Sequence, residues 1–394
     1  MPSNPHIIDN GTPGRYWHML DNGKIQCDIC PRECQLGDGQ RGLCFVRARK
    51  SDKIILTTYG RSSGFSIDPI EKKPLNHFLP GTAILSFGTA GCNLTCKFCQ
   101  NHDMSKSREM DKLQSRASPQ DIAITAVNHG CRSVAYTYND PVIFLEYAVD
   151  VARACKERNI KNVAVTAGYI KEAAREEFFE NMDAVNLDLK AFSKDFYKKL
   201  CTAEFGNILE TAKFLAQKQD TWLEITTLLI PNENDSDGEI QQLCNWVAKE
   251  LGPNIPLHFT AFHPDFKMLD TPRTPASTLI NAYDIAVKSG LNYVYTGNIL
   301  HEKTTSTYCP NCKEKLISRE WHQLQSWNIG ASQQGGGHCL KCEHPIVGIF
   351  EEKPGQWGRK RKRVIPDQYF DNAAQQPPPS KKSPSPKVIK LKLR

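Results

Sequence analysis

Three cysteines in one short stretch have the spacing best suited to chemistry. They lie in GTAGCNLTCKFCQ, where Cys92, Cys96 and Cys99 follow the pattern C-x3-C-x2-C directly after an apolar run and a glycine. A cubic 4Fe-4S cluster has four irons and normally four thiolate ligands. Three thiolates in one tight loop can hold three irons and leave the fourth open, as a catalytic zinc site keeps one exchangeable position. The spacing therefore indicates an iron-sulfur cluster with one open iron.

The open iron determines the chemistry that we expect. S-adenosylmethionine (SAM) can chelate it through its amino and carboxylate groups. An electron passed from the cluster into the sulfonium then breaks a carbon-sulfur bond and releases a 5′-deoxyadenosyl radical, which abstracts hydrogen from a substrate. The alternative is a zinc loop that borrows a distant fourth ligand, or a chance pattern among the fifteen cysteines.

Two further groups of cysteines flank the triplet. They are Cys27, Cys30, Cys34 and Cys44 near the N-terminus, and Cys309, Cys312, Cys339 and Cys342 near the C-terminus. The first group, interspersed with glycines, can wrap a second metal or an accessory iron-sulfur cluster; the alternative is four reduced structural thiols. The second group is a pair of C-x2-C knuckles typical of a zinc ribbon. We favour zinc there over an accessory cluster, and we favour a structural over a catalytic role because the protein fills all four positions.

The remaining cysteines and the N-terminal segment indicate the cellular compartment in which the protein works. Four cysteines without close partners are expected to be ordinary buried thiols, namely Cys131, Cys155, Cys201 and Cys244. The N-terminal segment lacks the apolar run of a signal peptide, and no stretch approaches ~18 uninterrupted apolar residues. The sequence therefore predicts a cytoplasmic protein without a membrane partner, whose thiols stay reduced.

The elements that position these residues follow from periodicity. Between about residues 80 and 300, short β-rich runs alternate with helical patterns, which predicts parallel strands joined by crossover helices. The expected strands are 83–88, 133–138, 162–166, 184–189, 222–230, 257–262 and 293–296. The expected helices are 119–129, 141–158, 171–181, 205–218, 235–251 and 275–288. No nucleotide-binding glycine fingerprint follows the first strand, so an α/β fold with a full or partial β/α (TIM-like) barrel is favoured. Active sites of such barrels lie where the strands end.

The chain resembles the radical SAM superfamily, within it the branch of pyruvate formate-lyase activating enzyme, and most closely the radical SAM enzymes of the AmmeMemoRadiSam system. The resemblance covers about residues 20–350 and is carried in order by GTAGCNLTCKFCQNHDMS, AYTYNDPVIFLEY, VTAGYI, VNLDLKAF and FHPDFKMLDTP. It implies that Cys92, Cys96 and Cys99 bind the 4Fe-4S cluster and that Phe98 lies beside the adenine of SAM.

The resemblance also implies that residues at three further strand ends bind the cofactor. The matching positions are Asn139, Asp140, Thr166, Gly168, Asp188 and Lys190. In related enzymes the motif at Asn139 and Asp140 contacts the methionine amino group, but its acidic residue is usually glutamate. Because Asp140 is one methylene shorter, the backbone must compensate or a water must bridge. Asp188 and Lys190 match an Asp-x-Lys pair that contacts the cofactor, while Thr166 and Gly168 are expected to border it. Taken alone, these residues could instead form an ion pair and a turn that starts a helix.

The substrate is not specified by the sequence. Glycyl-radical activation, modification of a protein or peptide, and rearrangement of a small molecule share this machinery. His258 and His263 are candidate substrate ligands or proton donors, although a lone histidine is more often packed or solvated. The resemblance implies an electron donor such as reduced flavodoxin or ferredoxin. The competing function is a structural zinc scaffold or nucleic-acid-binding module in which all three cysteine groups hold zinc.

Composition divides the chain into four parts. They are an N-terminal four-cysteine segment (1–79), the barrel (80–304), a zinc-ribbon-like segment (305–357) and a basic tail (358–394). The tail contains eleven Lys and Arg against two Asp and is rich in proline and serine, which predicts a disordered, solvated extension. Its run from Arg359 to Arg363 could contact nucleic acid. The rest of the chain is close to neutral and is not expected to bind nucleic acid.

Overall fold

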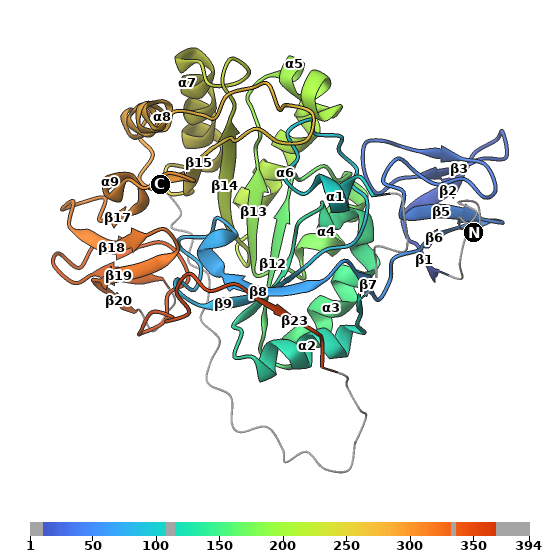
Figure 1. Ribbon diagram of the computed structural model, residues 1–394, viewed down its shortest axis with the longest axis horizontal. Coiled ribbons are helices and arrows are strands. Elements are labelled where there is room, and N and C mark those ends of the chain that lie inside the picture. The colour runs from blue at the N-terminus through green and yellow to red at the C-terminus, as the bar shows by residue number, and fades with distance from the viewer. Residues whose placement is uncertain (1–10, 108–114, 332–335, 368–394) are drawn as a thin grey trace, which may run out of the picture.

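The computed structural model describes residues 11–107, 115–331 and 336–367. At its centre is a nine-stranded sheet with the order β16-β15-β14-β13-β12-β11-β9-β8-β23 (Figure 1). Seven of these strands are parallel neighbours: β9 (Ala83–Phe87), β11 (Ser133–Tyr136), β12 (Lys161–Thr166), β13 (Ala184–Asp188), β14 (Trp222–Leu229), β15 (Leu257–Ala261) and β16 (Val294–Gly297). Each lies within two residues of its expected bounds. The order ends at β16 and β23, so the expected β/α fold is confirmed as an open, partial barrel.

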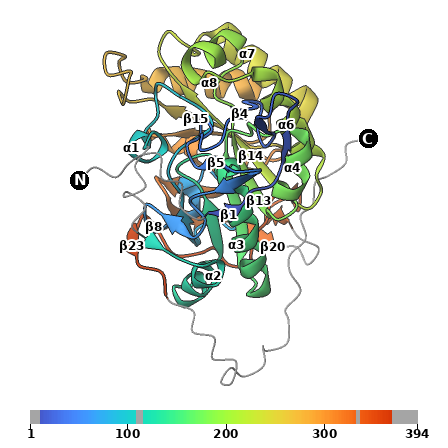
Figure 2. The same ribbon diagram turned by 90° about the vertical axis from the view of Figure 1, so that its right-hand side faces the viewer.

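The expected crossover helices are also present. They are α2 (Pro119–Asn128), α3 (Leu145–Glu157), α4 (Glu172–Phe179), α6 (Phe205–Gln217), α7 (Asp237–Trp246) and α8 (Ala276–Lys288). Figure 2 shows α2, α3, α4 and α6 along one side of the molecule. Ser118 caps α2 through a capping box with Asp121, and Pro119 occupies the first turn, as the sequence predicts. None of the described helices is long and apolar enough to cross a membrane.

Two expected helices are not α-helical throughout. The segment expected as 141–158 begins with a 3-10 turn, η3 (Pro141–Phe144), before α3. The segment expected as 235–251 ends in a π-helical turn, η5 (Val247–Leu251). Other short helices are η1 (Ile70–Lys72), α1 (His102–Ser105), α5 (Lys194–Phe196), the π-helical turn η4 (Tyr197–Cys201) and α9 (Glu302–Thr305). They lie mostly where the barrel strands end.

The first strands of the sheet correct two expected boundaries. β8 (Phe65–Pro69) pairs antiparallel with β9, and β23 (Lys362–Val364) pairs antiparallel with β8. The predicted start of the barrel at residue 80 was therefore wrong, because residues 65–69 already belong to its sheet. The prediction that the chain is disordered from residue 358 was wrong for residues 362–364. An edge strand presents unpaired backbone groups that even a short basic strand can satisfy, and composition does not reveal such a partner. The tail beyond residue 367 lies outside the described residues.

The N-terminal segment forms two small sheets beside the barrel, on the right of Figure 1. One contains β1 (Thr12–Pro13), β6 (Lys53–Leu56) and β5 (Arg47–Lys50), and the other contains β2 (Trp17–Met19), β3 (Ile25–Cys27) and β4 (Gln35–Leu36). β7 (Arg61–Ser62) pairs with β10 (Ser115–Arg116). Arg47 is buried and bonds both oxygens of Glu146 on α3, at 2.8 and 2.9 Å. This ion pair joins the N-terminal segment to the barrel.

The C-terminal module contains β17 (Thr307–Tyr308), β18 (Lys315–Glu320) and β19 (Gln323–Trp327) in one sheet, and β20 (Ile329–Ala331), β21 (Gly337–Cys339) and β22 (Pro345–Ile346) in another. Its apolar side chains, such as Leu316 and Ile317, form one buried cluster with Ile84, Ala135 and Trp222 of the barrel strands. Leu85, next to Ile84, belongs instead to the larger cluster with the helices. Because side chains alternate along strands, the module packs against the inner face of the sheet.

Candidate active site

The loop after β9 carries the cysteine triplet and is fixed by its backbone. Gly91 has φ +78°, and a side chain there would collide with the carbonyl oxygen of Cys44, so only glycine fits. Asn139, just beyond β11, holds the same loop. Its Oδ1 accepts from the Thr89 backbone N–H at 3.1 Å, and its Nδ2 donates to the Gly91 carbonyl at 2.8 Å. Asn139 therefore orients the cysteine loop.

The three thiols are held in different surroundings. Cys96 is buried, while Cys92 and Cys99 are partly exposed. A hydrogen bond from Cys201, together with the charges of Lys190 and Lys106, lowers the pKa of Cys96 to about 6 against the effect of burial. Three sulfur donors from one loop, with cations nearby to stabilise thiolates, fit an iron-sulfur cluster.

Cys201 is a contact that the sequence did not predict. It is buried, as expected, but it lies at the end of η4 against the cysteine loop rather than in an isolated part of the core. The Thr95 N–H donates to its carbonyl at 3.1 Å, and the Lys97 N–H donates to the Leu200 carbonyl at 2.9 Å. The chain after β13 thus braces the loop after β9. The two segments are about a hundred residues apart, so no local spacing could have indicated this contact.

A cavity of about 200 Å³ lies against the triplet, and most of the predicted cofactor residues line it. Those that do are Cys96, Cys99, Phe98, Asn139, Asp140, Asp188 and Lys190. Cys92 lines a separate cavity with Phe45 and Lys106. Thr166 and Gly168 lie one layer behind the lining. The strand ends therefore bring the predicted positions together, and we call this space the cofactor cavity.

Thr166 and Gly168 do not line the cofactor cavity but belong to the hydrogen-bond network that holds the Asp140 carboxylate there. The Thr166 hydroxyl donates to Asp140 Oδ1 at 2.9 Å, and the Ala167 N–H donates to Oδ2 at 3.2 Å. The Gly168 N–H in turn donates to Thr166 Oγ1 at 3.0 Å. Burial raises the pKa of Asp140 to about 6 even though these bonds oppose the shift. The shorter carboxylate is therefore held in place by its own neighbours.

Asp188 and Lys190 form an ion pair at the end of β13. Lys190 Nζ lies 3.0 Å from Asp188 Oδ2 and 5.9 Å from the centre of the Phe98 ring. Burial alone would lower the pKa of Lys190, but the charges of Asp188 and Cys96 outweigh it and raise this pKa well above its usual value. Lys190 is therefore a fixed positive charge between the cysteine loop and the cavity.

A larger cavity of about 410 Å³ occupies the barrel interior beneath the cofactor cavity. Thr137, Tyr138 and Val165 line both spaces, so the two adjoin. Its other walls carry charged residues that the sequence analysis did not single out. Among them are Glu71 of η1 and, from the C-terminal module, Arg319. We call this space the interior cavity. The C-terminal module thus forms part of its wall.

The two candidate histidines have different positions. His258 lines the interior cavity and is buried, and its Nε2 lies 2.7 Å from Oε2 of the buried Glu224. Glu224 also accepts from the backbone N–H groups of Asn76 and His77. His263 lies at the surface, 3.2 Å from Gln100. Of the two, His258 is placed to meet a molecule in the barrel.

The four C-terminal cysteine sulfurs lie within 4.8 Å of one another. The Sγ atoms of Cys309 and Cys342 are 3.6 Å apart, and those of Cys312 and Cys339 are 3.7 Å apart. A tetrahedral zinc ion with Zn–S bonds of ~2.3 Å separates its sulfurs by roughly 3.8 Å. The geometry fits zinc and indicates a further metal site.

The N-terminal cysteines converge less tightly. A side chain at Gly42 would lie 3.6 Å from Cys34 Sγ and 3.7 Å from Cys44 Sγ, so this glycine leaves room for the two sulfurs. Burial raises the pKa of Cys44 to about 12, and the charge of Cys27 adds to the shift. Among the residues with described positions, only the C-terminal group brings its four sulfurs this close together. A metal at the N-terminal group remains a prediction.

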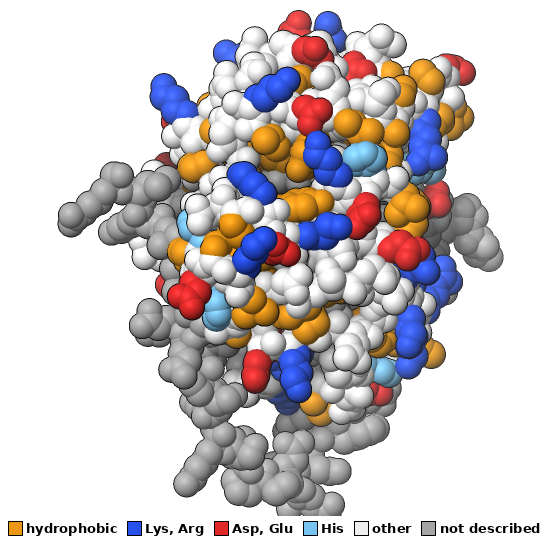
Figure 3. All heavy atoms as spheres, turned by 90° about the vertical axis from the view of Figure 1, so that its left-hand side faces the viewer, with side chains coloured by type: hydrophobic (Ala, Val, Ile, Leu, Met, Phe, Trp, Pro, Cys, Tyr) orange, Lys and Arg blue, Asp and Glu red, His pale blue; other side chains and the backbone are white. Residues whose placement is uncertain are grey.

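The surface beside the C-terminal module bears on the nucleic-acid alternative. Figure 3 shows Lys and Arg side chains interspersed with Asp and Glu over this face. Nucleic-acid-binding proteins usually gather basic side chains into one patch or stripe. Among the described residues that this view shows, the two signs of charge are not segregated.

Comparisons with known proteins show what the chain is similar to. The family model of the Radical SAM superfamily matches residues 87–244, which include the triplet and the end of β13. An uncharacterised protein of Methanocaldococcus jannaschii is 39% identical over 331 residues, which cover 84% of this chain and 97% of that protein. The pyruvate formate-lyase 1-activating enzyme of Escherichia coli is 26% identical over 192 residues, 47% of this chain and 75% of that enzyme. A solved radical SAM methyltransferase from Sphaerobacter thermophilus superposes with a TM-score of 0.45 at 15% identity, over 73% of this chain and 77% of that one.

Proposed function

Because the chain belongs to the radical SAM superfamily and is a radical SAM enzyme, we propose that it cleaves SAM beside the cysteine triplet and abstracts hydrogen from a substrate in the barrel interior. The observation that carries this proposal is the cofactor cavity, where Cys96 and Cys99 face Asp188 and Lys190. The interior cavity adjoins it at Tyr138, so a radical formed in one space would meet a molecule in the other.

The residues of the cofactor cavity have separate tasks. A bound 4Fe-4S cluster, once reduced, would supply the electron that breaks a carbon-sulfur bond of SAM. Cys92, Cys96 and Cys99 would hold the cluster, and Phe98 gives an apolar wall for the adenine. Lys190 stabilises negative charge next to Cys96. Asp140, fixed by Thr166, presents a carboxylate suited to an amino group.

Relatedness supports one class of substrate. The chain is related to glycyl-radical activating enzymes, and the Escherichia coli relative is named for activating pyruvate formate-lyase. We therefore favour a protein or peptide residue as the hydrogen donor for this chain, within the AmmeMemoRadiSam branch that its motifs resemble. A reduced flavodoxin or ferredoxin in the cytoplasm would supply the electron. The C-terminal group would hold structural zinc, and the N-terminal group a second metal or cluster.

Anaerobic reconstitution tests the proposal. We expect the full chain, supplied with iron and sulfide, to turn brown and to release 5′-deoxyadenosine when SAM and dithionite are added. Cys96→Ala should lose the cluster absorbance and this release. Cys131→Ala, which removes a buried thiol remote from the triplet, is the matched control and should retain both.

Two results would contradict the proposal. Normal 5′-deoxyadenosine release by Cys96→Ala would show that the triplet does not hold the catalytic cluster. A wild-type protein that binds only zinc and releases no 5′-deoxyadenosine would support the alternative zinc scaffold. Once SAM cleavage is established, transfer of deuterium from labelled candidate peptides into 5′-deoxyadenosine would identify the hydrogen donor.

A further inference from the structure

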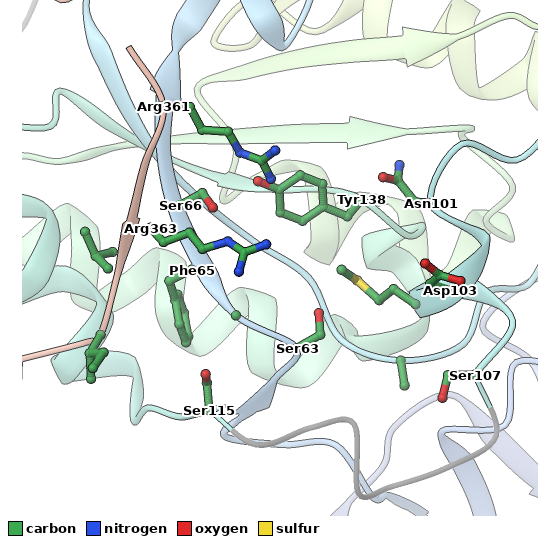
Figure 4. A pocket seen from close by; sticks show the side chains of 15 residues that line it. Ser63, Phe65, Ser66, Asn101, Asp103, Ser107, Ser115, Tyr138, Arg361 and Arg363 are labelled. Carbon is green, nitrogen blue, oxygen red and sulfur yellow. The ribbon is translucent and has the colours of Figure 1, made fainter. Parts of the chain in front are cut away.

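A third cavity of about 610 Å³ adjoins the cofactor cavity, and the proposed function does not use it (Figure 4). Asn101 and Tyr138 line both spaces, so one wall is shared. The opposite wall comes from β8 and from the segment at β23. We call this space the β23 cavity. A molecule bound in it would lie next to the site of radical formation.

Strand β23 turns two arginines of the basic run toward this cavity. Arg363 pairs with Ser66 and Lys362 pairs with Ile67, which fixes the register on β8. Arg361 lies one residue before β23 (Lys362–Val364). Because side chains alternate along extended backbone, it shares a face with Arg363, and Lys362 lies on the other. Figure 4 shows both guanidinium groups extending from β23 into the cavity beside Tyr138. The charge of Lys362 acts instead on the Cys131 thiol, outside the cavity.

The carboxylate of Asp68, bonded to the Tyr138 hydroxyl, does not cancel the charge of Arg361, because two lysines already pair with it. Asp68 on β8 is bonded by Lys72 and Lys73, each at 2.9 Å, and accepts from the Tyr138 hydroxyl at 3.1 Å. Arg361 Nε lies 3.8 Å from the same carboxylate. Although burial opposes it, Lys73 holds the pKa of Asp68 well below its usual range, so Asp68 is ionised. One carboxylate thus faces three cations.

The lining otherwise offers neutral donors and an apolar surface. Asp103 is the one acidic group among the described residues that line the cavity, and its side chain is 94% exposed. The hydroxyls of Ser63 and Ser115 face the cavity, and Phe65 and Met104 give it an apolar part (Figure 4). An arginine fork binds carboxylate or phosphate through two parallel hydrogen bonds. The lining therefore suits a ligand with an anionic group and an apolar body.

Tyr138 is held in a backbone conformation that its side chain rarely adopts. Its φ is +71°, in the left-handed region, which is unfavourable for a bulky residue. Such strain is typical of ligand-binding sites. The conformation places the ring where the cofactor, interior and β23 cavities meet. Tyr138 is thus placed to position a molecule that bridges these spaces.

We infer that the β23 cavity binds an anionic group, a carboxylate or a phosphate, of the substrate, and that Arg361 and Arg363 recognise it. This inference rests on the proposed function, because it gives the chemical class of the molecule from which hydrogen is abstracted. It also assigns a role to the basic run that the sequence predicts to be solvated. The run would recognise substrate rather than nucleic acid.

Anion binding to the full-length reconstituted holoenzyme tests the inference. Isothermal titration calorimetry at low salt would use inorganic phosphate in one arm and succinate in the other, which separates the two anion sources. We expect one of them to bind to the wild type and to bind at least about tenfold more weakly to Arg361→Gln/Arg363→Gln. Arg361→Lys/Arg363→Lys keeps the charge and should recover part of the affinity. If the double glutamine variant folds poorly, the affinity of the double lysine variant still tests whether the guanidinium groups recognise the anion.

The matched control is Arg359→Gln/Lys362→Gln, which removes the same charge from the same run but outside the cavity. It should bind the anion as the wild type does. Equal weakening in both double variants would overturn the inference, because attraction to the basic run as a whole would then suffice. The inference would also be overturned if the wild type bound neither phosphate nor succinate.

The proposed function is judged by a different measurement. If the wild type releases 5′-deoxyadenosine from SAM but binds neither anion, only the inference about the β23 cavity fails. If it binds an anion through Arg361 and Arg363 but never cleaves SAM, the site stands and the proposed chemistry fails. Recording both measurements on one preparation keeps the two outcomes separate.

Discussion

Single residues of the site are set by contacts with distant parts of the chain. Asp140 is held by Thr166 and by the backbone at Ala167, and Cys96 is adjusted by Cys201. Glu71 is a further example. Its Oε1 accepts from the Gly81 N–H at 2.6 Å, while its Oε2 is buried without a hydrogen-bond partner among the described groups. An ionised carboxylate would be costly in that position.

The titration of Glu71 gives the first prediction. Burial raises its pKa to about 7, whereas in the unfolded chain it titrates near the ordinary value of ~4.3. Between these values the folded state keeps a proton that the unfolded state releases, so stability falls as pH rises from about 4.5 to about 7. Glu71→Gln should lack this loss. Urea unfolding at pH 5 and pH 8 should show the wild type losing roughly 2–3 kcal/mol more than the variant.

The control for this titration is an exposed carboxyl such as Asp52, since Asp52→Asn should follow the wild-type pH dependence. An identical pH dependence in the wild type and Glu71→Gln would mean that Glu71 is ionised in the folded protein. It would then present a negative charge to the interior cavity.

At the scale of elements, strand ends and small modules create the site. The loop after β9, the turn after β11 and the end of β13 meet at the cofactor cavity because parallel strands end at one edge of the sheet. Two modules support this edge. The N-terminal sheets reach it through Cys44, whose carbonyl approaches Gly91. The C-terminal module supplies Arg319 to the interior cavity.

The ion pair between β5 and α3 gives the second prediction. Arg47 and Glu146 are both buried, and Arg47 also donates to the Arg15 carbonyl at 2.7 Å. Arg47→Met leaves a buried carboxylate without its cation and should cost about 3–5 kcal/mol in urea unfolding. Arg47→Met/Glu146→Leu removes both charges and should lie closer to the wild type. A double variant that is less stable than the single one would contradict this explanation.

The zinc site gives the third prediction. Cys339→Ser should lower the zinc content by one atom per chain, as measured by inductively coupled plasma mass spectrometry. It should also lower the melting temperature, because the apolar cluster around Trp222 depends on the module. Cys244→Ser, at a buried thiol on α7, is the control and should keep its zinc. Loss of iron rather than zinc from Cys339→Ser would assign an accessory cluster to this group.

At the scale of the whole molecule, the two ends of the described chain both attach to the barrel. Cys44 of the N-terminal segment approaches the loop that carries the triplet. At the other end, β23 completes the sheet, and the Asp367 N–H donates to the Thr125 hydroxyl on α2 at 2.8 Å. The barrel is therefore enclosed by segments that precede and follow it in sequence. Its open edge at β8 is covered by the chain itself.

Truncation tests this enclosure and gives the fourth prediction. Ending the chain after residue 357 removes β23 and exposes the edge of β8, which should cost about 2 kcal/mol in lost backbone hydrogen bonds and favour association through the free edge. Ending it after residue 367 keeps the strand and serves as the control. The comparison uses melting temperature and size-exclusion chromatography. Equal melting of the two truncated chains would mean that β23 does not stabilise the sheet.

The sequence by itself determined whatever depends on neighbours along the chain. The triplet comes from one loop, so its spacing predicted the ligand set that fits a cluster. The parallel strands and crossover helices were predicted nearly to their bounds, because periodicity along each element reports which face is buried. The C-x2-C knuckles at Cys309 and Cys339 predicted a metal site in the same way.

The tertiary structure alone decided contacts between residues far apart in sequence. Packing between elements places β8 and β23 in the barrel sheet and brings Cys201 to Cys96. It also makes Arg319 part of the wall of the interior cavity. The basic tail shows the reason. Its composition indicates disorder, but the edge of β8 offers unpaired backbone groups. Pairing with this edge directs the side chains of Arg361 and Arg363 toward the β23 cavity. Local patterns record a residue's chemistry, whereas long-range packing decides what that chemistry faces.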